Sequence, residues 1–182
     1  MKKALRFIIA LAGIVTVTAV VVGARAPAKA PAEFQPVWTE FKWPFLLDQW
    51  GVGRAFVCKP TECGVEVNVY LRPKIGFCKC ETGVDDDDEL ERVSDINLIN
   101  NKTVVLGPGR PIEVAWMKGR SRRYGVGGST EDQLLSIAFN DSCDVIVAVA
   151  MLQRSNQDAT EQAVIAFLNS DRVVHWVKWL VS

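Results

Sequence analysis

The five cysteines are the residues of this chain with the clearest potential for chemistry. They are Cys58, Cys63, Cys78, Cys80 and Cys143. The first four follow the spacing C-x4-C and then C-x-C, whereas a zinc ribbon needs C-x2-C pairs and a thioredoxin-like site needs C-x-x-C beside a βαβ unit. In an oxidising compartment disulfides are the default for such a set. The spacing therefore favours disulfides, with a metal site or a catalytic or redox-sensing thiol as the alternatives.

Sequence separation limits how these cysteines can pair. Cys58 and Cys63 flank a four-residue turn at residues 59–62 between two expected strands, which places them opposite each other in a hairpin. Cys78 and Cys80 are too close in the chain to pair without strain. We therefore expect one of these two to pair with Cys143 and one cysteine to stay free.

A group of basic residues follows in the second half of the chain. It consists of Arg120, Arg122, Arg123 and Tyr124, with glycines directly after them. We interpret this group as a compact basic loop and a candidate interaction patch. Its ligand is an anion, a lipid headgroup or the chain's own acidic run, and a plain exposed loop is the alternative.

The acidic run covers residues 85–89 together with Glu91. Clustered carboxylates supply the oxygen ligands that calcium needs, but the spacing and central glycine of an EF-hand are missing. We expect a solvated loop that opens a short helix, because acidic residues are favourable at a helix N-terminus.

No residue set in the chain amounts to an active-site signature. His175 is the only histidine, and it falls on the polar stripe of the last expected helix, which disfavours a nucleophile–His–Asp triad. Paired-carboxylate chemistry stays open, because any two acids can meet in a fold. We expect a protein that is not an enzyme and that uses no cofactor.

The N-terminal residues have the pattern of a targeting segment. Lys2, Lys3 and Arg6 precede an uninterrupted apolar run over residues 7–23. A basic start followed by an apolar run predicts a signal-anchor or signal peptide over residues 1–23. The run is long for a signal peptide and short for a spanning helix. Pro27 and Pro31 directly follow the two A-x-A sites and should impair cleavage, so we favour an uncleaved anchor.

This segment also sets the expected location and partners. The basic N-terminus should stay in the cytoplasm, which predicts a single-pass protein of a bacterial inner membrane with its C-terminal domain in the periplasm. Cleavage would instead release a soluble periplasmic form. Beyond residue 26 the chain has 17 basic and 21 acidic side chains, a net charge of −4. Nucleic acid is therefore disfavoured as a partner, and the expected partners are the membrane and an envelope protein.

Residues 24–45 form an Ala/Pro- and aromatic-rich connector, which reads as a semi-rigid spacer. The aromatic residues here and just beyond are Phe34, Trp38, Phe41, Trp43, Phe45 and Trp50. We expect this arm to pack onto the domain and supply core. A partner-binding arm and a contact with the membrane surface are the alternatives.

Residues 46–182 predict a single α+β domain, an antiparallel sheet with two C-terminal helices, preceded by the N-terminal transmembrane or signal helix. Apolar and polar residues alternate over residues 65–72, up to Pro73, and over residues 112–117. The other expected strands span residues 53–59, 75–80, 103–106, 134–139 and 144–151. The nearly all-apolar run at 144–151 predicts a central strand, and the turn residues at 140–142 predict a hairpin.

Two helices are expected at the C-terminus. Asp158 with Glu161 resembles a capping box for the first, which ends near Asn169. Ser170 or Asp171 caps the second helix. Its core-facing residues are Val173, Val174, Trp176, Val177, Leu180 and Val181, and Arg172, His175 and Lys178 lie on the opposite stripe.

One stretch also carries a resemblance. WPFLLDQWGVGRAFVC at residues 43–58, followed by GFCKC at residues 76–80, resembles uncharacterised exported or membrane-anchored proteins of alphaproteobacteria. The resemblance implies export and transfers no functional residue. The sequence thus predicts a non-enzymatic, membrane-anchored or periplasmic envelope protein with an interaction or structural role. The alternative is a thiol- or metal-dependent redox module that uses Cys78 and Cys80.

Overall fold

The computed structural model describes residues 36–152 and 156–181. These residues belong to one compact unit. The predicted signal-anchor or signal peptide at residues 1–23 and the start of the connector, with Phe34, lie outside the described residues. Within the described part of the chain, no helix is long and apolar enough to cross a membrane.

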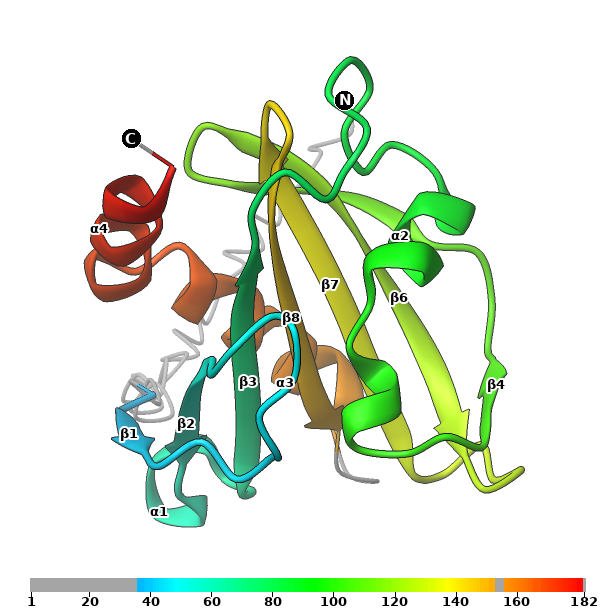
Figure 1. Ribbon diagram of the computed structural model, residues 1–182. Helices are drawn as coiled ribbons and strands as arrows, with labels where there is room; N and C mark the ends of the chain where they lie inside the picture. Colours follow the sequence, from blue (N-terminus) through cyan, green and yellow to red (C-terminus); the bar gives the residue numbers. More distant parts are fainter. Residues whose placement is uncertain (1–35, 153–155, 182) are drawn as a thin grey trace, which may run out of the picture. The chain divides into compact units, whose positions relative to one another are not determined.

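The domain is built on one antiparallel sheet. Its strands are β1 (Trp38–Phe41), β2 (Arg54–Cys58), β3 (Val67–Lys74), β4 (Thr103–Val105), β5 (Arg110–Val114), β6 (Met117–Val126), β7 (Gln133–Asp141) and β8 (Asp144–Leu152). The strand order is β1-β2-β3-β8-β7-β6-β4, and β5 also pairs with β6 (Figure 1). Together with two C-terminal helices, this confirms the predicted α+β class.

The apolar strand β8 lies in the middle of the sheet, as its composition predicts. It pairs with β3 on one side and with β7 on the other. The register joins Asp141 to Asp144, so a tight turn at Ser142 and Cys143 links β7 to β8. The hairpin predicted at this turn is confirmed.

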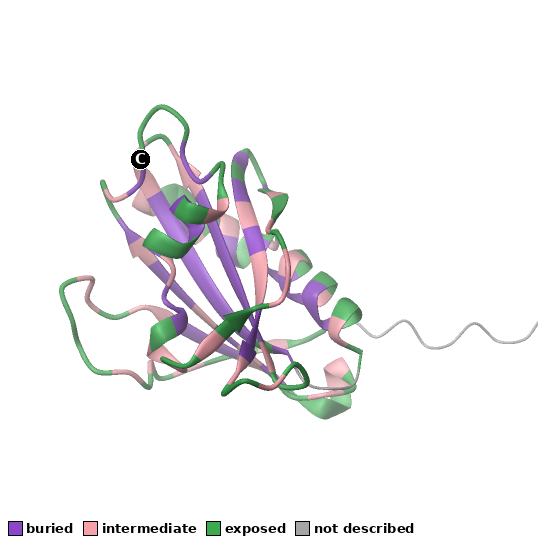
Figure 2. Ribbon diagram, turned by 90° about the vertical axis from the view of Figure 1, so that its right-hand side faces the viewer, coloured by how far each residue is buried: buried purple, intermediate pink, exposed green. Residues whose placement is uncertain are grey.

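Helices cover both faces of the sheet. Two helices, α3 (Gln157–Leu168) and α4 (Asp171–Leu180), cover the first face, and their buried residues Val164, Phe167 and Val177 join the main core. The second face is covered by α2 (Asp87–Val93) and the short 3-10 helix η1 (Ile96–Leu98). Figure 2 shows that the buried residues are concentrated in the strands between these layers.

Two strand predictions are wrong, and each has a physical reason. Residues 75–80 form a loop rather than a strand, because β3 continues through Pro73 to Lys74. β2 begins at Arg54, opposite Leu71, and does not extend to Pro73, so Pro73 has a strand on one side only. The alternating residues 112–117 are not one strand but a hairpin, in which Ala115 adopts a positive φ of 53° between β5 and β6.

The start of α3 also differs from the prediction. Asn156 is the N-cap residue, so Asp158 lies inside the first turn and the predicted capping box with Glu161 does not form. Both carboxylates instead accept hydrogen bonds from Arg123 on β6. The helix ends near Asn169, as predicted, and Ser170 is the N-cap residue of α4, although its side chain makes no capping hydrogen bond.

The last helix buries a narrower face than its sequence pattern predicts. Val173 and Val177 are buried, whereas Trp176 and Leu180 are half-buried against the main core. His175 is exposed, as predicted, and its Nδ1 lies 2.8 Å from the carbonyl oxygen of Asp171.

The aromatic arm packs onto the domain, as expected for the part of it that is described. Its residues 38–41 form β1, which pairs with β2 at the edge of the sheet. Trp38 stacks on Phe167 of α3 with ring centroids 4.5 Å apart. The sheet thus begins inside the segment assigned to the connector at residues 24–45.

Candidate functional site

The first disulfide joins Cys58 and Cys63, as predicted. The local structure differs from the expected hairpin, because Pro60–Cys63 forms a single helical turn, α1. Cys58 faces Val67 across the β2–β3 ladder rather than Cys63. The helical turn therefore brings Cys63 to Cys58, and the bridge closes a short local loop.

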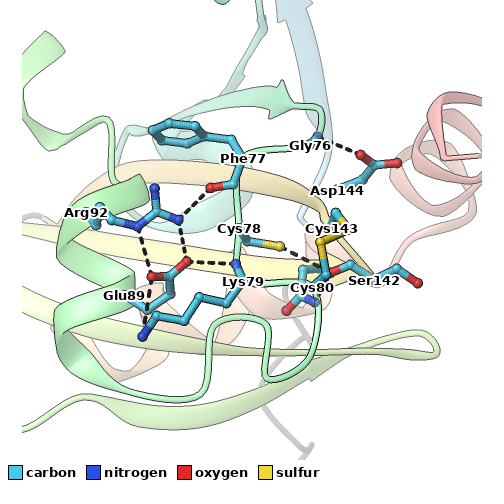
Figure 3. Close-up of a disulfide and its surroundings, with 11 residues drawn as sticks. Gly76, Phe77, Cys78, Lys79, Cys80, Glu89, Arg92, Ser142, Cys143 and Asp144 are labelled. Atoms are coloured by element: carbon cyan, nitrogen blue, oxygen red, sulfur yellow. Dashed lines mark hydrogen bonds and ion pairs between the residues drawn. A yellow bond between two sulfur atoms is a disulfide. The ribbon is translucent and has the colours of Figure 1, made fainter.

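The second disulfide joins Cys80 and Cys143, one of the two pairings that the sequence left open. Cys143 lies in the β7–β8 turn, and Cys80 lies in the loop that leads from β3 to α2. This bridge fixes the start of the segment that covers the second face of the sheet. Figure 3 shows it beside Cys78 and Ser142.

Cys78 is the free cysteine among the described residues, and it is buried. Its thiol donates a hydrogen bond to the carbonyl oxygen of Ser142 at 3.2 Å (Figure 3). Burial, with the nearby Glu89 carboxylate as a smaller cause, raises the pKa of this thiol above its usual value. A buried thiol with a raised pKa is a poor nucleophile and a poor metal ligand at neutral pH.

Glu89 ties α2 to the loop that carries these cysteines. Its buried carboxylate accepts hydrogen bonds from Arg92 at 2.5 and 2.9 Å and from the backbone N–H of Lys79 at 3.2 Å. Arg92 also donates to the carbonyl oxygen of Phe77 at 2.6 Å. This network, shown in Figure 3, gives the cysteine loop a fixed position.

The predicted basic loop is wrong, because Arg120, Arg122, Arg123 and Tyr124 all lie in the long strand β6. Side chains alternate between the two faces of a strand, so the group is divided. Arg120, Arg122 and the buried Tyr124 lie on the face that α2 covers, whereas Arg123 lies on the face of α3. These residues therefore do not form one surface patch.

On the α2 face the arginines bind the chain's own acidic run, one of the three ligands that the sequence left open. Arg120 Nε donates to Asp87 at 2.6 Å, and Arg122 Nη1 donates to Glu91 at 2.6 Å. The carboxylate of Asp87 also accepts from the backbone N–H of Gly109 at 2.9 Å. The acidic run begins a short helix as predicted, with Asp85 and Asp88 exposed to solvent. Its carboxylates Asp87, Glu89 and Glu91 make α2 an ion-paired cover of the sheet.

Because these carboxylates are ion-paired in the folded domain, we expect the domain to lose stability in acid. The Gly109 N–H and then Arg120 hold the pKa of Asp87 below its usual 3.8, and Arg92 holds that of Glu89 below 4.5. A carboxyl group whose pKa is lower in the folded protein contributes its full stabilisation at pH values above its pKa in the unfolded chain. That stabilisation is lost as the pH falls through its pKa in the folded protein.

We expect the urea midpoint of unfolding to be nearly constant down to about pH 5 and to fall steeply below about pH 4.5. Urea titrations of the full chain in detergent measure this. Asp87→Asn should lower the midpoint at neutral pH and flatten the acid dependence. A midpoint that rises in acid would contradict this role of the carboxylates.

The other half of the same face of the sheet, over β3, holds an ion cluster that the sequence pattern did not predict. Arg72 and Lys74, at alternate positions of β3, both contact Asp95, which lies between α2 and η1. Arg72 donates two hydrogen bonds to Asp95, at 2.6 and 2.8 Å, and a third to Asp48 at 2.6 Å. Lys74 donates to the carbonyl oxygen of Val93 at 2.6 Å, and its burial lowers its pKa. The only sequence signal was two cations in an apolar strand.

The loop between β1 and β2, residues 42–53, is held firmly against this ion cluster. Trp43 and Phe45 pack edge-on against Tyr70 of β3, and Trp50 contacts Phe77 with centroids 4.4 Å apart. Gly53 leaves no room for a side chain, because a Cβ there would lie 2.5 Å from the Trp43 ring. Both halves of the loop therefore pack against the domain, the first on β3 and the second on Phe77 in the segment after β3.

Between these braces the loop exposes apolar side chains. We call Leu46, Leu47 and Val52 the apolar loop tip; their exposed fractions are 91%, 74% and 65%. Leu46 and Leu47 are the only exposed leucines among the described residues. Asp48 and Gly51, between Leu47 and Val52, close a turn through a 3.0 Å backbone hydrogen bond. The sequence predicted that this aromatic arm packs, but it did not separate the packing rings from the exposed leucines.

The described residues show no arrangement typical of a catalytic centre or a metal site. His175 is exposed on α4, and within residues 36–152 and 156–181 no three His, Cys, Asp or Glu side chains are placed to hold a metal ion. The chain matches no protein-family model, and no curated protein or solved structure is significantly similar to it. Its function must therefore be argued from its own residues.

Proposed function

We propose that this chain is a membrane-tethered periplasmic domain with an interaction role in the bacterial envelope. The observation that carries the proposal is the pair of disulfides, Cys58–Cys63 and Cys80–Cys143. Such bonds persist in oxidising compartments and are rare in the cytosol. They support the export that the basic N-terminus and the apolar run at residues 7–23 predict.

An interaction role agrees with how the charged groups are used. The arginines of β6 and the cations of β3 are paired with carboxylates of the same chain, so they act in holding the cover of the sheet in place. The apolar loop tip, which includes the most exposed large apolar side chain of the described residues, Leu46, takes no part in these charge pairings. A domain with a rigid frame and an exposed apolar loop is suited to binding rather than to chemistry.

The redox alternative has less support. It needs Cys78 and Cys80 to act together, but Cys80 is bonded to Cys143 and the thiol of Cys78 is buried with a raised pKa. Reactive cysteines have lowered pKa values and are accessible to solvent. We therefore assign these cysteines a structural role.

Reporter fusions test the proposed topology. Alkaline phosphatase fused after Ser182 should be active, and a fluorescent reporter that matures only in the cytoplasm should stay dark at the same position. The full chain should remain in the membrane after alkaline carbonate extraction. The opposite reporter pattern would overturn the proposal. An N-terminus near residue 25 would replace the anchor by a cleaved signal peptide and a soluble periplasmic form.

A further inference from the structure

We infer that the apolar loop tip inserts into the surface of the bilayer to which the chain is tethered. The inference rests on the proposed function and extends it, because it names a second membrane contact and the face of the domain that makes it. The membrane partner is defined by chemistry: the boundary between acyl chains and headgroups, which accepts leucine and aromatic side chains.

The first support is that the exposure is built into the loop. Leu46 and Leu47 lie between Phe45, which packs on Tyr70, and Asp48, which forms a salt bridge to the buried Arg72. Fixed on both sides, the two leucines cannot fold back onto the sheet without breaking these contacts. A scattered exposed leucine needs no explanation, but adjacent leucines on a braced loop present a small apolar surface.

The second support is the residues around the tip. Trp43, Phe45 and Trp50 are half-buried at its base, and tryptophan is enriched where proteins meet the membrane interface. The single acidic residue of the loop, Asp48, is neutralised by Arg72, and Lys42 is exposed at its start. The tip therefore brings no unpaired negative charge to anionic headgroups.

The third support is the length of chain between the apolar run and the sheet. The run ends at residue 23 and β1 begins at Trp38, so residues 24–37 form the tether. A Pro-rich chain of this length would span about 43 Å in the polyproline II conformation, at about 3.1 Å per residue. The loop follows β1 directly, so it remains within reach of the bilayer. Such tethering makes even a weak second contact effective, because its local concentration is high.

A membrane contact at this loop would orient the domain. The loop joins β1 and β2 at one edge of the sheet, whereas β4 and β5 lie at the other edge (Figure 1). The loop itself lies over the face that α2 and η1 cover, where its Asp48 binds Arg72 beside Asp95, so a tip in the bilayer surface would turn this face toward the membrane (Figure 1).

Fluorescence quenching in vesicles tests the inference with the full chain. The chain is reconstituted into vesicles of phosphatidylethanolamine and phosphatidylglycerol, at about one copy per vesicle to exclude self-association. An environment-sensitive NBD probe is attached to Leu46→Cys or, as the matched control, to Val104→Cys, an exposed apolar position on β4. Both variants carry Cys78→Ser and keep the disulfides.

The probe at position 46 should be quenched by doxyl-labelled lipids and protected from aqueous iodide, whereas the probe at position 104 should show the reverse. A second set of variants carries the probe at Val52→Cys. In this set, the double substitution Leu46→Ser and Leu47→Ser should lower the fraction of probe in contact with lipid about fivefold, because it removes the preference of two leucines for the membrane interface. Val104→Ser with Val105→Ser should leave that fraction unchanged.

Three results would overturn the inference, and they are distinguishable. If the chain floats with the vesicles but position 46 is as open to iodide as position 104, the tether stands and the loop contact is wrong. Protection of position 46 without quenching by doxyl lipids indicates a protein contact instead. If the unlabelled chain is released from vesicles by carbonate, the membrane tether itself is wrong.

Discussion

Asp95→Ala is expected to destabilise the domain by about 3–5 kcal/mol, because it removes the partner of two buried cations at once. Arg72 is only 2% exposed, and Lys74 is buried beside it. Both side chains contact Asp95 Oδ1, at 2.6 and 2.8 Å. Without this carboxylate, two positive charges share an apolar environment with Asp48 as the remaining acid. Urea unfolding of the full chain in detergent, followed by circular dichroism, measures the loss.

Asp48→Ala is the matched control, since it removes a carboxylate from the same arginine at a more exposed position. The Asp48 side chain is 39% exposed, so its ion pair should contribute about 0–1 kcal/mol. Equal losses for Asp48→Ala and Asp95→Ala would show that burial of the cluster is not what makes it important.

Removing the Cys80–Cys143 bridge is expected to cost about 4 kcal/mol, and removing the Cys58–Cys63 bridge about 2 kcal/mol. The difference follows from loop length, because the two bridges join residues 63 and 5 positions apart. In the loop-closure model the longer loop restricts the unfolded chain more. The paired variants Cys80→Ser with Cys143→Ser and Cys58→Ser with Cys63→Ser can be compared in the same urea titration.

The structure adds a second reason for the larger effect. The long bridge fixes the loop before α2, and α2 with η1 carries Leu90, Val93 and Ile96 into the core of the second face. Loss of the bridge should therefore loosen this cover first, which faster amide exchange at Leu90 and Val93 would report. A larger loss from the short bridge than from the long one would contradict this account.

The elements with strong local patterns could be predicted from the sequence. The apolar run of β8 and the turn residues after β7 placed the central hairpin correctly, and Asn169 ends α3 as its pattern indicates. Proximity in the chain also excluded a Cys78–Cys80 bridge, which left two partners for Cys143. Local information was not enough to choose between them, because the choice depends on how the loop after β3 enters the β7–β8 turn.

The errors came from residues whose role is set by distant partners. β6 resembles a loop because it carries charges on both faces, but its arginines meet Asp87 and Glu161, which are 33 and 38 residues away in the chain. Asp158 and Glu161 fit a capping box in the sequence, but in the structure both carboxylates bind Arg123 of β6 instead. The hairpin at Ala115 was not predicted, because the alternation of apolar and polar residues continues through the turn as it would in a single strand. In each case a tertiary contact overrides the local preference.

The most direct test of the account is a count of thiols in the protein isolated from the envelope of its native host. Cells are quenched with acid and the denatured chain is alkylated without reduction, followed by peptide mapping. We predict one alkylated cysteine, Cys78, and two linked peptide pairs, Cys58 with Cys63 and Cys80 with Cys143. Five alkylated cysteines would contradict the oxidising compartment and with it the proposed periplasmic domain.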